Sequence, residues 1–273
     1  MLSKLRNSYI FGPVISRRLG ISLGVNVLPN SNKICNFNCV YCECGWNSDY
    51  KKSDENKFSS NEFPSRKEIK IQLEEVLSQM SNEHQNLDTI TFSGNGEPTL
   101  NPEFLEIIDD TILLRNKYFP NIKISVLSNS TMLHSPKIVE ALSKIENPIL
   151  KLDSANIETI EKINLPKNNN LTKNFNNKIT LEKIIDGMKQ FNGNFILQIM
   201  FLRGENNGDI FDNTTDAEIS NLLTVMQETK PRQIMIYSID RATPAQNLVK
   251  LDKTEMERIA KKIENIGFNV MCV

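Results

Sequence analysis

The sequence predicts an α/β protein built as a partial (β/α)6 barrel of the TIM type. Apolar, β-branched segments alternate six times with amphipathic segments of helical period, the order that gives a parallel sheet with helical crossovers. The length of 273 residues fits one such domain, since barrels of this kind run to roughly 250 residues. Small, charged and thiol side chains follow each strand, where barrels bind their ligands.

The predicted strands are short stretches rich in Val, Ile and Leu, bounded by Gly, Pro, Asn or Asp. In chain order they cover residues 20–28, 87–93, 122–127, 148–152, 194–202 and 232–239. Residues 268–273 have the composition of a further, terminal strand. A doubly wound open sheet is the competing architecture, because periodicity alone does not distinguish it from a barrel.

Start signals and helical spacing predict the helices between these strands. Ser65 with Glu68 forms a capping-box pattern, and Pro102 and Pro136 stand at first helical positions. The predicted helices cover residues 65–80, 101–117, 135–145, 156–164, 180–191, 215–228 and 252–265. Two polar stretches without periodicity, 51–60 and 166–178, are predicted to be exposed loops.

We expect a single domain over residues 1–273, with a lead-in at 1–19 and a long loop at 29–64. The chain has 39% hydrophobic and 24% charged residues and a net charge of −1, which excludes a disordered or collagen-like protein. No apolar run is long enough to span a bilayer, and the first residues lack an apolar signal core. A cytoplasmic protein without membrane partners is therefore expected.

Four of the five cysteines fall within ten residues. Cys35, Cys39 and Cys42 have the spacing C-x-x-x-C-x-x-C, and soft thiolates suit an iron–sulfur cluster or zinc. Structural zinc closes four ligands, and Cys44 lies too close to Cys42 for a comfortable fourth. Three thiolates on a cubane cluster leave one iron open to a ligand. Cys44 is either a free thiol or an alternative ligand, and Cys272 is expected to be packed.

The other strand ends offer further polar side chains. They are Gly94, Asn95, Gly96, Glu97 and Pro98; Ser128, Asn129 and Ser130; Asp153 and Ser154; residues 203–206; and Asp240 and Arg241. Plainer explanations exist for some: a helix cap for Asp153, and a solvated ion pair for Arg203 with Glu205. His84 and His134 lie outside the strand ends and are expected to be exposed.

The segment C-N-F-N-C-V-Y-C at residues 35–42 resembles the C-x-x-x-C-x-aromatic-C signature of the radical S-adenosylmethionine (SAM) superfamily. Residues 94–98 (G-N-G-E-P) are similar to the glycine-rich motif that follows the second strand in that family. More narrowly, the chain resembles poorly characterised iron–sulfur oxidoreductases related to wybutosine-type radical SAM proteins. The segments that carry this resemblance are S-R-R-L-G at 16–20, S-L-G-V at 22–25, and I-D-R at 239–241 with Pro244. Arg17 and Arg18 are alternatively plain surface charges.

The resemblance implies a radical SAM core with a [4Fe–4S] cluster on Cys35, Cys39 and Cys42, and SAM on the open iron. It implies that Tyr41 lies near the adenine and that residues 94–98 admit the methionyl amine. The remaining candidate contacts to SAM or substrate are Ser128, Asn129, Asp153, Arg203, Glu205, Tyr237 and Arg241. An electron donor such as flavodoxin or ferredoxin is implied as a partner.

The leading hypothesis is a radical SAM enzyme that abstracts hydrogen from an unidentified substrate, with tRNA or another macromolecule as the first expectation. An activase that places a glycyl radical on a partner protein keeps the same chemistry. A non-catalytic zinc or iron–sulfur protein, including a simple electron carrier, is the third hypothesis. Fold analogy alone does not choose between them.

Overall fold

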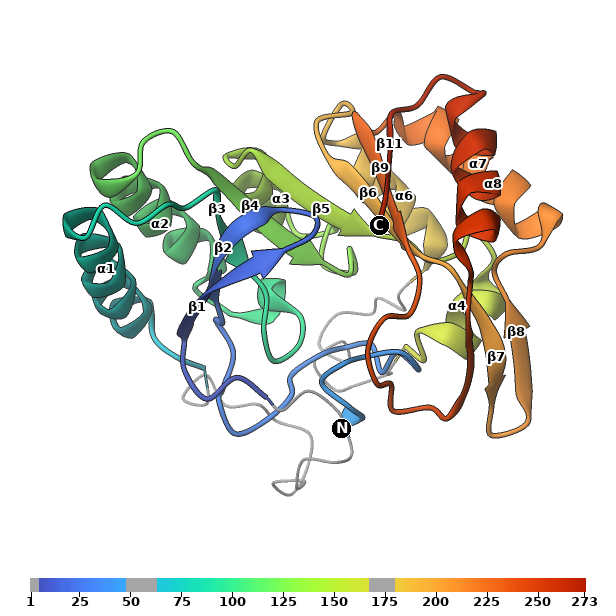
Figure 1. The fold of residues 1–273 in the computed structure, drawn as a ribbon, viewed down its shortest axis with the longest axis horizontal. Helices are drawn as coiled ribbons and strands as arrows, with labels where there is room; N and C mark the ends of the chain where they lie inside the picture. Colours follow the sequence, from blue (N-terminus) through green and yellow to red (C-terminus); the bar gives the residue numbers. More distant parts are fainter. Residues whose placement is uncertain (1–4, 48–62, 167–179) are drawn as a thin grey trace.

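An eight-stranded, curled sheet organises the molecule (Figure 1). The computed structural model describes residues 5–47, 63–166 and 180–273. Within them the sheet has the order β1-β2-β3-β4-β5-β6-β9-β11. Its strands are β1 (Ile10–Ser16), β2 (Gly20–Val25), β3 (Thr89–Phe92), β4 (Lys123–Ser128), β5 (Asn147–Lys151), β6 (Ile196–Met200), β9 (Gln233–Tyr237) and β11 (Val270–Cys272).

The strand order decides between the two predicted architectures. From β2 to β11 all neighbours are parallel and follow the order of the chain. A doubly wound sheet would instead reverse its order at a switch point. The partial barrel is therefore confirmed. It is a half-barrel, because no pairing joins its edge strands β1 and β11 within the described residues.

Helices cover the outer face of the curled sheet (Figure 1). They are α1 (Arg66–Asn82), α2 (Phe104–Tyr118), α3 (Pro136–Ser143), α4 (Ile157–Ile163), α6 (Leu181–Lys189), α7 (Asp216–Thr229) and α8 (Lys253–Glu264), with a 3₁₀ turn η3 (Pro98–Leu100). The capping box of Ser65 with Glu68 is present at α1. The second helix begins at Phe104 rather than at 101, because Asn101 has extended backbone and its amide donates to the Val27 carbonyl.

Alternation along the strands separates an apolar outer face from a polar inner one. In β3, Ile90 and Phe92 pack into the core formed with the helices. On the opposite face, the Thr91 hydroxyl lies 2.7 Å from the Ser22 hydroxyl, and the Thr89 hydroxyl lies 2.9 Å from that of Ser125. The concave side of the half-barrel is consequently lined with hydroxyl groups.

Two antiparallel features were absent from the sequence prediction. The lead-in contains β1, which pairs with β2 as a hairpin. A small second sheet joins β10 (Asn247–Lys250), β7 (Leu202–Asn206) and β8 (Asp209–Asp212). Residues 203–206, expected as a loop, belong to β7. The alternative of an ion pair between Arg203 and Glu205 is wrong, because Arg203 pairs with Glu255 at 2.6 Å on the neighbouring helix α8.

The exposure of the histidines and of Cys272 was also predicted from the sequence. His84 and His134 are exposed, as predicted. Cys272 is exposed rather than packed, because β11 is the edge strand of the sheet. The predicted loops at 51–60 and, after its first residue, 166–178 lie outside the described residues. Across the described part of the chain, every helix is too short or too polar for a bilayer crossing.

Candidate functional site

The cysteine loop follows β2 and is held against the glycine-rich segment after β3. The Ile34 amide donates to the Asn95 carbonyl at 2.9 Å, and the Glu97 amide donates to the Ile34 carbonyl at 2.9 Å. Gly96 has φ of +137°, and a Cβ there would lie 1.8 Å from the Ile34 carbonyl oxygen. Glycine is needed at this position so that the two segments can approach each other.

Further hydrogen bonds hold the loop to the end of α4 and to the loop after β4. The Asn38 amide donates to the Asn164 carbonyl, and the Val40 amide donates to the Ile163 carbonyl, both at 2.9 Å. The Asn36 side-chain amide donates to the Thr131 hydroxyl at 2.6 Å. The glycine-rich segment, the end of α4 and the loop after β4 therefore together fix the backbone that carries the thiols.

A buried cation lies beside the thiols. Lys33 is 5% exposed, and its Nζ donates to the Gly45 carbonyl at 2.6 Å. Burial lowers the pKa of Lys33, but the negative charge of Cys42 and Cys35 outweighs it, so the net direction is upward. A hydrogen bond from Cys44, together with the Lys33 charge, lowers the pKa of Cys42 to about 5 despite burial. Cys42 is thus disposed to be a thiolate.

The other two thiols of the motif are more deeply desolvated. Burial raises the pKa of Cys39 to about 11 and raises that of Cys35 further. Both sulfurs accept side-chain amide hydrogen bonds, Cys39 from Asn164 at 3.4 Å and Cys35 from Asn129 at 3.7 Å. Such bonds stabilise a metal-bound thiolate in a dry site.

The donor set fits a multi-iron cluster better than a single zinc ion. Structural zinc takes four protein ligands, whereas the motif supplies three thiolates on one loop. Three thiolates on a cubane cluster leave one iron open to another ligand. Soft thiolates suit iron–sulfur clusters, and the buried Lys33 beside them offsets their negative charge.

Asp153 lies at the centre of a buried hydrogen-bond network at the ends of β5 and β6. It is 2% exposed. Its Oδ1 accepts from the Met200 amide at 2.9 Å and faces the Lys151 ammonium at 3.1 Å. Its Oδ2 accepts from the Asn164 side-chain amide at 2.8 Å and from the Tyr41 hydroxyl. The network attaches Tyr41, inside the cysteine motif, to the strand ends.

The alternative role of Asp153 as a helix cap is wrong. The side chain of Asn156 caps α4 by accepting from the Glu158 amide. Asp153 is instead occupied by the buried donors around it.

Lys151 extends this network to Tyr237 on β9. Its Nζ donates to the Tyr237 hydroxyl at 2.7 Å and lies 4.9 Å from the ring centroids of both Tyr41 and Tyr237. Sequence reasoning missed Lys151, Lys33 and Asn164. A lysine that ends an otherwise apolar strand was an available signal for Lys151, whereas Asn164 carries none.

Glu97 joins the end of β3 to the end of β4. It is 2% exposed and accepts from the Asn129 amide at 2.6 Å, the Ser128 hydroxyl at 3.0 Å and the Thr99 hydroxyl at 2.5 Å. Burial nevertheless raises its pKa. Both carboxylate oxygens are engaged by protein donors, and the predicted contacts of Glu97, Ser128 and Asn129 to SAM stay predictions.

Asn95 is engaged within the protein as well. Its side chain accepts from the Arg6 amide at 2.7 Å and donates to the carbonyls of Arg6 and Pro29 at 3.0 and 2.9 Å. The neighbouring Gly94 carbonyl accepts from the Cys44 thiol at 3.3 Å. Asn95 therefore ties the lead-in to the glycine-rich segment.

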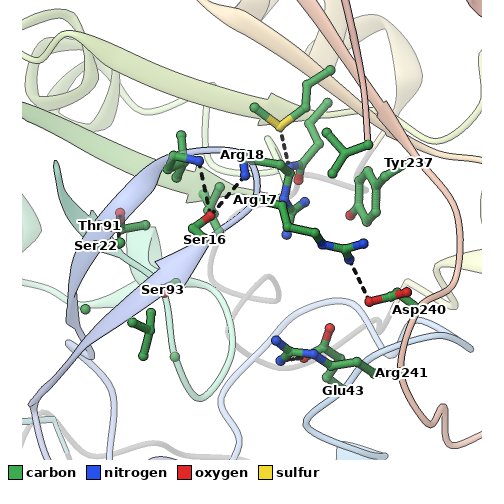
Figure 2. A pocket seen from close by; sticks show the side chains of 18 of the residues that line it. Ser16, Arg17, Arg18, Ser22, Glu43, Thr91, Ser93, Tyr237, Asp240 and Arg241 are labelled. Atoms are coloured by element: carbon green, nitrogen blue, oxygen red, sulfur yellow. Dashed lines mark hydrogen bonds and ion pairs between the residues drawn. The ribbon is translucent and has the colours of Figure 1, made fainter. Parts of the chain in front are cut away.

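A cavity of about 380 Å³ occupies the concave side of the half-barrel (Figure 2). Of the predicted site residues, Gly94, Asn95 and Tyr237 line it. Cys44 lines it as well, whereas the three motif cysteines do not. Six further predicted site residues do not line this cavity: Tyr41, Gly96, Glu97, Ser128, Asn129 and Asp153. The site thus has a buried part around the thiols and an adjoining open part in the lumen.

The chain is similar in sequence to known proteins. The model of the radical SAM superfamily matches residues 30–214, more than half of the chain. A UPF0026 protein of Helicobacter pylori strain J99 is 31% identical over 201 residues, which are 72% of this chain and 57% of that protein. A Brachyspira hyodysenteriae protein named GTPase Obg is 29% identical over 266 residues, 96% of this chain and 34% of that protein. The chain therefore spans between about a third and three fifths of these relatives.

A solved structure agrees on the fold. Streptococcus suis SuiB bound to S-adenosylmethionine superposes with a TM-score of 0.59 at 14% identity, covering 92% of this chain and 50% of SuiB. The narrower resemblance to wybutosine-type proteins stays a prediction. The curled parallel sheet, the cysteine loop and the family match agree, and the chain belongs to the radical SAM superfamily of enzymes.

Proposed function

We propose that this chain holds a [4Fe–4S] cluster on Cys35, Cys39 and Cys42 and cleaves SAM reductively in order to abstract hydrogen from a substrate. One observation carries the proposal: the cysteine loop is bridged through Ile34 to the glycine-rich segment at Gly96, with Lys33 buried beside its thiols. When bound, the cluster and SAM supply a one-electron cleavage of the sulfur–C5′ bond that yields a 5′-deoxyadenosyl radical.

The residues of the chain would hold and shield these groups. The amides of Asn164 and Asn129 donate to two of the thiol sulfurs, and the Lys33 ammonium offsets negative charge there. Gly94 and Tyr237 line the lumen cavity, which supports their assignment to SAM binding. Tyr41 is held by Asp153, and its place near the adenine of SAM is part of the same proposal.

The test is anaerobic reconstitution with iron and sulfide, followed by SAM and dithionite, with 5′-deoxyadenosine measured by chromatography. We expect wild type to form 5′-deoxyadenosine and Cys39→Ala to form none and to lose iron. Cys272→Ala is the matched control, because it removes an exposed thiol at the sheet edge. Cleavage by Cys39→Ala at the wild-type rate would refute the assignment, as would a colourless wild-type protein that binds zinc.

Redox partners and substrate belong to the same proposal. A flavodoxin or ferredoxin would supply the electron that dithionite supplies in the test. A macromolecular substrate, tRNA or protein, remains the first expectation from the sequence. A SuiB structure bound to its precursor peptide shares the fold with a TM-score of 0.60 at 15% identity, so this architecture accommodates a peptide in that protein.

A further inference from the structure

The motif S-R-R-L-G builds a tight turn between β1 and β2 that borders the lumen cavity (Figure 2). The Ser16 hydroxyl accepts from the amides of Arg18 and Leu19 at 3.3 and 3.2 Å. Gly20 has φ of +76°, and a Cβ there would lie 2.3 Å from an Asp88 carboxylate oxygen. The turn is therefore fixed by its own residue types and holds both arginines at the cavity wall.

The two arginines of the turn have different partners. Arg17 forms an ion pair with Asp240 at 2.6 Å, as Figure 2 shows. The Arg18 guanidinium lies 4.6 Å from the ring centroid of Tyr237. Within the described residues, Arg18 has no carboxylate partner. Stacking on a ring fixes the guanidinium plane and leaves its N–H edges available to a ligand.

A second arginine of the same cavity repeats this arrangement. The Arg6 guanidinium lies 4.2 Å from the ring centroid of Phe11 and, in the part of the chain described, is likewise without a carboxylate partner. The two other arginines of the lining are neutralised, Arg17 by Asp240 and Arg241 by Glu43 at 2.8 Å. Arg6 and Arg18 thus leave the cavity with an excess of positive side-chain charge.

The rest of the lining suits a polar ligand. Ser22, Thr91, Ser93 and Gln198 face the same space. A cavity walled by protein concentrates the field of its charges, because the surrounding dielectric is low. An anion with several oxygen acceptors would satisfy both the guanidinium groups and the hydroxyls.

We propose that Arg18, together with Arg6, binds an anionic oxygen group of the substrate, a phosphate or a carboxylate, at the wall of this cavity. Guanidinium groups bind both anions through paired N–H donors. The proposal rests on the proposed function, since the substrate meant is the molecule that loses hydrogen. It assigns the S-R-R-L-G motif to substrate recognition.

The experiment measures anion binding to the anaerobically reconstituted protein by isothermal titration calorimetry at constant ionic strength in chloride. Inorganic phosphate is one probe and acetate the other, so the two arms distinguish the two anions. We expect wild type to bind at least one probe and Arg18→Met to weaken that binding roughly tenfold or more. Arg258→Met, on the exposed face of α8, is the matched control and should bind as wild type does.

A second measurement separates this site from the binding of SAM itself. Because Arg18 stacks on Tyr237, a proposed SAM contact, equilibrium dialysis should show a much smaller loss of SAM affinity than of anion affinity for Arg18→Met. If SAM binding falls as far as anion binding, the guanidinium serves the cofactor and the proposal is wrong. It is equally wrong if wild type binds neither anion or if Arg18→Met binds them unchanged. Should Arg18→Met fail to fold, Arg18→Lys keeps the charge without the paired donors and should weaken anion binding in the same direction.

The assay for 5′-deoxyadenosine tests the proposed function independently. Anion binding does not require SAM cleavage. A wild-type protein that binds phosphate through Arg18 and leaves SAM intact would count against the proposed function and against calling the ligand its substrate, while the anion site itself would stand. A protein that cleaves SAM and binds neither anion would refute the anion site alone.

Discussion

Replacing Lys151 by methionine should destabilise the protein strongly although Lys151 is a single charged residue. The variant leaves the Asp153 carboxylate, whose side chain is 0% exposed, without its cation. Breaking a buried ion pair on one side costs about 3–5 kcal/mol of unfolding free energy. Asp153 keeps three donors, from Met200, Asn164 and Tyr41, so we expect the lower end, about 3 kcal/mol.

The effect should be constant across neutral pH. Burial lowers the pKa of Lys151, but the Asp153 carboxylate and the Tyr237 hydroxyl outweigh burial, and the net direction is upward. A group whose pKa is raised in the folded state stabilises fully below its ordinary pKa and loses that contribution only at higher pH. The ordinary value is 10.5, so the deficit of Lys151→Met should be unchanged between about pH 6 and 9.

Urea unfolding followed by circular dichroism measures this loss. Lys117→Met is the matched control, since Lys117 is 59% exposed and pairs at 2.8 Å with the half-exposed Glu74, and it should unfold close to wild type. The double variant Lys151→Met with Asp153→Asn should recover part of the loss, because no buried charge is then left unpaired. A loss below about 1 kcal/mol for Lys151→Met would refute the reasoning.

Two further predictions concern backbone approach and acid stability. Gly96→Ala should reduce the iron content after reconstitution and lower the stability of the protein more than Gly208→Ala does. Both glycines have positive φ, but only at Gly96 would the new Cβ lie 1.8 Å from a carbonyl oxygen, that of Ile34. Equal effects of the two variants on iron content and unfolding would contradict this. Hydrogen bonds from Arg66 at 2.6 and 2.9 Å lower the pKa of Asp110, so its stabilisation is present above the ordinary value of 3.8 and lost as the pH falls through the lower folded value. Asp110→Asn should therefore flatten the fall in melting temperature below about pH 4, and an unaltered acid slope would count against it.

Elements with local signals could be predicted from the sequence, and those without them could not. The capping box at Ser65 and the β-branched run of β3 are properties of a few neighbouring residues, and both were found. Strand β1 was missed because it lies at the sheet edge: Ile15 is 91% exposed, and Pro13 interrupts the pattern. Exposed strands bury little, so burial imposes no period on their side chains.

The same distinction explains what could be predicted of the site. The thiol spacing is local, and it pointed to the cluster loop at once. The partners that hold this loop are far away in the sequence: 125 residues separate Asn164 from Cys39. Likewise 223 residues separate Arg17 from Asp240. Only the fold brings these groups together, and no pairwise spacing in the chain predicts them.

One signal for the cavity was nevertheless present in the strands. Parallel strands buried on both faces are usually apolar throughout. Here Ser22 and Thr91 alternate with apolar residues in β2 and β3, and Gln198 does so in β6. Polar side chains on the inner face need hydrogen-bond partners, and a barrel core packed with apolar side chains would not provide them. Alternation in parallel strands therefore predicts a polar cavity inside the barrel, and the lumen between β2 and β9 is that cavity.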